Sequence, residues 1–189
     1  MRTPQYQDTV DKIMNLNLDP MKIKLMIEDD GPCWTREQCN AAEKWYKRFL
    51  ILNLLYPDKS IVPSKEIDEM WHYHILDTEK YAEDCQDTFG YFLHHFPYFG
   101  MRGEEDAKKL QSSFLETQEL YIKEFGEPLA ELRRVFIGES AAECDGSKGT
   151  TCSADDCSKC GASCSGAKCN PDSKMRRVDY SIRPSLAGV

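Results

Sequence analysis

Apolar residues recur at helical spacing along most of this chain. The clearest stripe leads from Trp45 through Phe49 and Leu52 to Tyr56, immediately before Pro57. Because an α-helix has 3.6 residues per turn, apolar positions three or four residues apart lie on one face and can pack against a core. No segment keeps the strict alternation of a half-buried strand. The pattern therefore predicts an all-α protein.

Capping and turn residues divide this pattern into about six helices. Thr35 and Gln38 have the spacing of a capping box, which predicts that a long helix begins here. Ser64 is a candidate N-cap, while Gly90 and Gly126 favour the left-handed conformation that ends a helix. The helices are expected over residues 6–14, with its continuation to Leu18 left open, and over residues 21–28, 35–57, 64–76, 77–89 and 104–125, with a shorter one over 128–136.

The composition changes sharply after the last expected helix. Aromatic residues are dense up to Phe136, and only Tyr180 follows; residues 140–177 contain no large apolar side chain except one methionine. Such a segment cannot bury enough apolar surface to offset the entropy lost on ordering the chain. We therefore expect a single helical domain over residues 1–137 and a disordered tail, rich in Cys, Gly and Ser, over residues 138–189.

The overall composition and charge limit the partners. Hydrophobic residues make up 41% and charged residues 30% of the chain, as in soluble globular proteins. No apolar run approaches the roughly 18 residues that cross a bilayer, and the N-terminus lacks the apolar stretch of a secretory signal. We therefore expect a cytoplasmic protein without a membrane partner. The net charge of -8 and the pI near 5.1 disfavour nucleic acid, which leaves an unknown protein or small molecule as the expected partner.

All four histidines lie between His72 and His95, in the sequences WHYHIL and FLHHFPYFG. Asp68 precedes His72 by four residues, the spacing at which a carboxylate and an imidazole can share one ion. His94 or His95 would complete a mononuclear metal site from the following turn. On an intact helix His74 points nearly opposite to His72 and falls on the apolar face, so it should be buried. His74 becomes a further ligand only if the helix ends or distorts there.

Other interpretations of this region stay open. A histidine on an apolar helix face is more often a hydrogen-bonded core residue than a ligand, so the cluster could reflect packing alone. Glu69 and His72 have the E-x-x-H spacing of di-iron bundles, but no second copy occurs, which favours a mononuclear site. Cys85 is either a further ligand or a core thiol. If an ion binds, the ligand types favour zinc, iron or copper without specifying one.

A long motif connects these residues. The pattern D-x-x-W-H-x-H-I-L, followed by Y-x-x-D-C and H-H-x-P, falls here on Asp68, Trp71, His72, His74, Ile75, Leu76, Tyr81, Asp84, Cys85, His94, His95 and Pro97. It resembles the signature of the uncharacterised glycine-rich-domain-containing-protein-like family, over about residues 34–125. The resemblance implies that the clustered polar residues belong to one shared site, and it implies no particular reaction.

The expected tail carries six of the nine cysteines, including one C-x-x-C step. Closely spaced thiolates suit soft or borderline ions such as Cu(I) and Zn(II), and a reducing compartment favours metal or redox use over structural disulfides. The alternatives are a low-complexity disordered segment, a disulfide knot that requires export, or a redox buffer. The candidate metal ligands of the tail are Cys152, Cys157, Cys160, Cys164 and Cys169.

Three functions fit these observations. The first is a metal-binding helical domain, with the ion held in the body of the protein and serving an oxidoreductase or a hydrolase. The second is a non-enzymatic metal-handling or protein-interaction module that uses the cysteine-rich tail. The third is a structural helical domain whose histidines only pack. No nucleophile motif such as G-x-S-x-G indicates covalent catalysis, so the sequence leaves enzyme status open.

Overall fold

The computed structural model describes residues 4–27 and 31–137, so the predicted tail and its cysteines lie outside the described residues. Within these ranges the chain forms seven α-helices and no strand, which confirms the all-α prediction. The short segment near residue 130 is a helix and brings the number to seven. The helices are α1 (Pro4–Met14), α2 (Asp19–Met26), α3 (Arg36–Leu55), α4 (Lys65–Leu76), α5 (Thr78–Phe89), α6 (Glu104–Phe125) and α7 (Ala130–Ile137).

Several helix ends follow from local sequence. The Thr35 side chain accepts a hydrogen bond from the backbone N–H of Gln38, and the Gln38 side chain accepts one from the backbone N–H of Thr35, so the predicted capping box opens α3. Gly90 ends α5 with a φ of 73°, and Gly126 ends α6 with a φ of 70°. Glycine reaches this left-handed region at little cost, which explains why both helices end where predicted.

The junction between α1 and α2 differs from the prediction. The prediction left open whether the first helix continues to Leu18 and began the second at Met21, whereas α1 ends at Met14 and α2 already begins at Asp19. Pro20 therefore lies inside the first turn of α2, where its missing N–H removes no intrahelical hydrogen bond. Leu18 is buried just before α2, so its apolar character indicated core packing and not a continuing helix.

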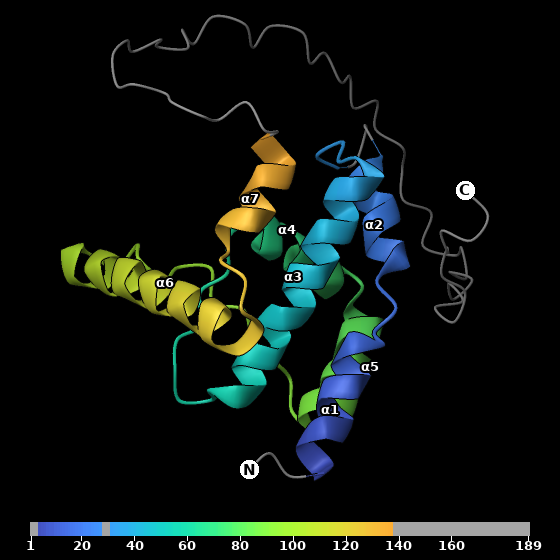
Figure 1. The fold of residues 1–189 in the computed structure, drawn as a ribbon, viewed down its shortest axis with the longest axis horizontal. Coiled ribbons are helices and arrows are strands. Elements are labelled where there is room, and N and C mark those ends of the chain that lie inside the picture. The colour runs from blue at the N-terminus through green and yellow to red at the C-terminus, as the bar shows by residue number, and fades with distance from the viewer. Residues whose placement is uncertain (1–3, 28–30, 138–189) are drawn as a thin grey trace, which may run out of the picture.

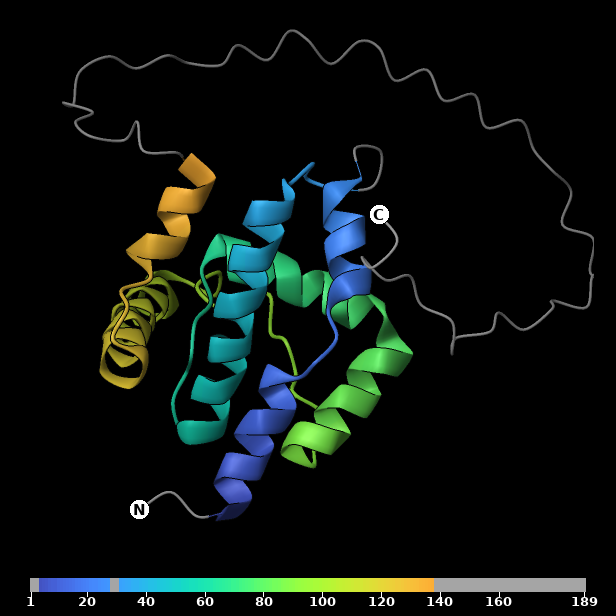
Figure 2. The same ribbon diagram turned by 45° about the vertical axis from the view of Figure 1, so that its right-hand side comes forward.

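The long helix α3 lies at the centre of the fold. Figures 1 and 2 show α1, α2 and α5 on one side of α3 and α6 and α7 on the other, while α4 crosses behind it. Tyr46, Phe49 and Leu52 of α3 are fully buried, as are Ile67 and Met70 of α4. Burying each such side chain stabilises the fold by roughly 1.5–3 kcal/mol. This packing fixes α4, the helix that carries the candidate site, against the core.

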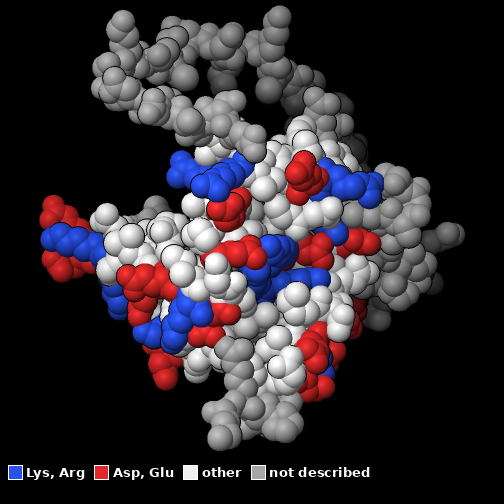
Figure 3. Space-filling model, in the orientation of Figure 1, with Lys and Arg blue, Asp and Glu red and all other residues white. Residues whose placement is uncertain are grey.

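Charged side chains are interleaved on the face shown in Figure 3, where acidic and basic residues alternate among the coloured atoms. One ion-pair cluster joins distant parts of the chain, because Glu127, between α6 and α7, accepts hydrogen bonds from Arg48 and Lys44 of α3. Arg48 and then Lys44 lower the pKa of Glu127 to about 2.

None of the described helices has an apolar stretch long enough to span a membrane.

Candidate metal centre

Helix α4 carries two of the three residues of the candidate site. It runs without a break to Leu76, so residues four apart lie on the same face. Met70 and Trp71 are buried on its inner face, and Asp68 and His72 lie at the edge of that face. The distance from His72 Nε2 to Asp68 Oδ2 is 3.6 Å, so the predicted pair is in place.

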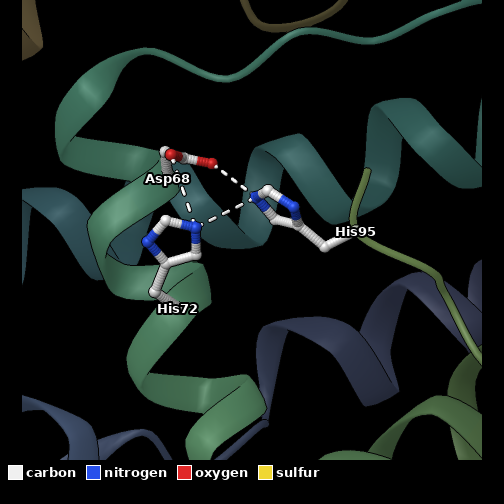
Figure 4. Close-up of side chains that lie close together, drawn as sticks. All are labelled: Asp68, His72 and His95. Carbon is white, nitrogen blue, oxygen red and sulfur yellow. Dashed lines mark hydrogen bonds and ion pairs between the residues drawn. The ribbon is translucent and has the colours of Figure 1, made fainter. Parts of the chain in front are cut away.

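His95 reaches this pair from the loop between α5 and α6. Its Nε2 atom lies 2.9 Å from Asp68 Oδ1 and 3.1 Å from His72 Nε2. Figure 4 shows the three side chains pointing toward one another, two from α4 and one from the loop. Within the described ranges they form the only group of three or more side chains suited to hold a metal ion.

The spacing of these atoms suits a single ion. Nitrogen and oxygen ligands lie about 2.0–2.2 Å from zinc, so two ligands of one tetrahedral ion are separated by roughly 3.3–3.6 Å. The two Nε2 atoms, 3.1 Å apart, need to separate by only a few tenths of an ångström to reach that range. Two imidazole nitrogens at this distance need either a proton or a cation between them, since their lone pairs repel each other. A metal ion would satisfy both nitrogens and the carboxylate together.

The site is open on one side. The His72 side chain is 45% exposed and the Asp68 side chain 35%, while that of His95 is 15% exposed. The inner wall is the Trp71 ring, whose centroid lies 4.5 Å from that of His95. Water or a small ligand can therefore approach from the side of His72, while His95 is fixed from behind.

Comparison with known proteins places this geometry in a family. A family model described as UCP032817-like matches residues 10–118, which is more than half of the chain. The chain belongs to the UCP032817-like family. Comparisons with the curated proteins and with the solved structures give no significant match. The UCP032817-like match does not bear on the resemblance to the glycine-rich-domain-containing-protein-like family, which stays a prediction.

The UCP032817-like region contains all three residues of the candidate metal centre, and it ends within α6. It covers neither α7 nor the cysteine-rich tail. The matched region thus runs from within α1 to about two thirds of the way along α6, and it includes the part of the fold that builds the site.

His74, also within the UCP032817-like region, lies away from the candidate metal centre. It is 1% exposed, as its place on the apolar face predicts. Its Nδ1 atom lies 2.9 Å from the Tyr46 hydroxyl and its Nε2 atom 2.9 Å from Asp84 Oδ2. Lys80 also donates to Asp84, over 2.7 Å. Both ring nitrogens are thus occupied, and because α4 is not distorted, His74 does not join His72.

The pKa shifts in this cluster indicate which ring nitrogen of His74 carries the proton. Burial lowers the pKa of His74, although the Asp84 carboxylate acts in the opposite direction, so the ring is neutral at pH 7. Burial raises the pKa of Tyr46, and its hydroxyl donates to Nδ1. The Nε2–H then donates to Asp84. Burial acts to raise the pKa of Asp84, but the hydrogen bonds from His74 and Lys80 outweigh it and the pKa is lowered.

The other candidate residues of the body do not join the triad. His94 is exposed and packs beside Phe92, with ring centroids 5.0 Å apart. Cys85 is a buried core thiol, and burial raises its pKa, which disfavours the thiolate that a metal requires. Glu69 is not part of the group either. Of the five predicted body ligands, the fold brings together Asp68, His72 and His95.

Sequence reasoning missed the partners of His74. Tyr46 lies beside the apolar stripe of α3 and is buried with it, and nothing in the sequence distinguishes a hydroxyl that points to a histidine from that of an ordinary core tyrosine. Asp84 and Tyr81 are part of the motif Y-x-x-D-C. That motif was the available signal for them, although it does not reveal which side chain each one contacts.

Proposed function

We propose that this protein is a metal-binding helical domain that holds one divalent transition-metal ion between Asp68, His72 and His95. The observation that carries the proposal is the convergence of three ligand atoms from two separate segments, with Nε2 of His95 2.9 Å from Asp68 and 3.1 Å from His72. Imidazole and carboxylate ligands favour zinc, iron or copper.

The number of ligands supports a catalytic ion more than a structural one. Structural zinc sites are closed by four protein ligands, whereas catalytic sites use three and keep a position for water or substrate. Two histidines and one carboxylate are also the ligand set of mononuclear non-haem iron enzymes. An ion held here would polarise a bound water or substrate oxygen at the exposed side of His72. This supports a metal-dependent hydrolase or oxidoreductase.

The proposal is tested by metal binding to the full chain, produced without a polyhistidine tag. A variant with all six tail cysteines replaced by serine separates the body from the tail. In that background, isothermal titration with Zn²⁺ and with anaerobic Fe²⁺, followed by elemental analysis, should give one ion per chain. His72→Ala and His95→Ala should lose this ion. His94→Ala is the matched control, because it removes an exposed histidine from the neighbouring position.

Two results would contradict the proposal even if the unchanged chain binds an ion. If the serine variant binds no ion while the unchanged chain does, the tail is the metal-binding segment and the protein is a metal-handling module. If His94→Ala weakens binding as strongly as His95→Ala, the two loop histidines contribute equally to binding. The site is then not the triad of Asp68, His72 and His95.

A further inference from the structure

Tyr81 lies behind the candidate metal centre and makes no hydrogen bond to Asp68, His72 or His95. It is a residue of α5 and is 1% exposed. Its hydroxyl accepts a hydrogen bond from the Trp71 indole N–H, 2.9 Å away, and donates one to the backbone carbonyl of Leu93. One buried hydroxyl therefore connects α4, α5 and the loop that follows α5.

Both partners of the Tyr81 hydroxyl lie close to His95. Trp71 forms the wall against which the His95 ring packs, at a centroid distance of 4.5 Å. Leu93 lies two residues before His95 in the same loop, so a fixed Leu93 carbonyl limits where the His95 backbone can lie. Other groups also hold this loop, since the Leu93 backbone is hydrogen-bonded to the Cys85 thiol and Arg102 lies over the Phe96 ring, but Phe92 and Phe96 remain 44% and 53% exposed.

The ring of Tyr81 is held independently of its hydroxyl. It meets the rings of His74 and Phe92 edge to face, at centroid distances of 4.9 and 5.1 Å. These contacts belong to the aromatic carbons, so a phenylalanine would keep them. The hydroxyl can therefore be removed without removing the packing that holds α5 against α4.

We propose that Tyr81 is the positioning residue of this centre, which orients His95 through Trp71 and Leu93 and thereby determines the affinity for the ion. The proposal rests on the proposed function, because it concerns the same three ligands. Residues that orient metal ligands typically change metal affinity by about 10- to 100-fold when they are replaced. We expect a loss of that size from Tyr81→Phe.

The chain offers a matched control in Tyr121. This tyrosine of α6 is also fully buried, and its hydroxyl also donates to a backbone carbonyl, that of Trp45, over 3.4 Å. Its helix contributes no ligand to the centre. Tyr121→Phe thus removes the same atom from a comparable environment elsewhere in the core, and it should leave the affinity for the ion unchanged.

The experiment combines two measurements on the full chain with the tail cysteines replaced by serine. Zn²⁺ titration should show an affinity about 10- to 100-fold lower for Tyr81→Phe than for Tyr121→Phe, with both variants folded by circular dichroism. Hydrogen exchange without metal should be faster at the backbone amides of residues 93–96 in Tyr81→Phe alone. Equal Zn²⁺ affinities in the two variants, or unchanged exchange in this loop, would overturn the positioning role.

The two proposals fail in different ways. If the parent chain binds neither Zn²⁺ nor Fe²⁺, the proposed function fails, and loop exchange alone then decides whether Tyr81 positions His95. If Tyr81→Phe does not fold, Trp71→Phe tests the same connection from the other side, since it removes the N–H that donates to Tyr81. An unchanged Zn²⁺ affinity in Trp71→Phe would overturn the proposal.

Discussion

Asp84 is the acceptor at the buried end of the His74 cluster, and its replacement by alanine should lower the free energy of unfolding by about 3 kcal/mol. His74 is 1% exposed, so Asp84→Ala leaves its Nε2–H without an acceptor in the interior, which costs about 1–3 kcal/mol. Lys80, whose side chain is 12% exposed, loses a carboxylate 2.7 Å away. Since this pair reaches solvent, we add only about 1 kcal/mol for it.

The assay is urea unfolding at pH 7, followed by circular dichroism. Asp87→Ala is the matched control, because Asp87 is an exposed residue of the same helix. Alanine is a better helix former than aspartate by about 0.5 kcal/mol, and this gain is the same in both variants. We expect Asp84→Ala to be less stable than Asp87→Ala by about 3 kcal/mol. Asp84→Asn should fall between them, since it keeps an oxygen acceptor but not the charge.

A difference below about 0.5 kcal/mol between Asp84→Ala and Asp87→Ala would refute this reasoning, because such a difference is no larger than that of an ordinary surface substitution. It would mean that His74 finds another acceptor or water when the carboxylate is absent. The buried cluster would then be a consequence of the packing between α4 and α5, and it would not stabilise that packing.

Three further predictions concern the fold. Gly90→Ala should lower stability by about 1 kcal/mol in thermal unfolding, because the residue has a φ of 73° and a Cβ would meet no atom within 4 Å, so the cost is conformational alone. Thr35→Ala should cost about 1 kcal/mol in urea unfolding through loss of the capping box of α3, whereas Thr35→Ser should cost less. The pKa of Glu127 is lowered from 4.5 to about 2 in the folded protein. The contribution of Glu127 to the free energy of unfolding is therefore complete above pH 4.5 and is lost as the pH falls toward 2. Between pH 5 and pH 3, the free energy of unfolding measured with urea should therefore change less with pH in Glu127→Gln than in the unchanged protein.

Features determined by neighbouring residues could be predicted from the sequence. The capping box at Thr35 and the left-handed glycine at Gly90 act within one helical turn, and both are present. The burial of His74 followed from the helical wheel alone, because α4 is regular. The pairing of Asp68 with His72 followed for the same reason.

Features determined by distant contacts could not be predicted. His94 and His95 are adjacent in an irregular loop, where no periodicity says which one faces α4. His95 faces α4 because the Trp71 ring packs on the His95 ring and the Tyr81 hydroxyl holds the carbonyl of Leu93. These contacts depend on how α4, α5 and the loop lie in space.

The two histidines of WHYHIL have separate environments because a helix turns by about 100° per residue. His72 faces outward beside Asp68, and His74 faces inward, where Asp84 and Tyr46 occupy its ring nitrogens. His74 nevertheless affects the candidate metal centre indirectly. His74 and Asp84 join α4 to α5, and α5 carries Tyr81, whose hydroxyl holds the loop of His95. The buried cluster thus supports the candidate metal centre through the placement of α5, without contributing a ligand to it.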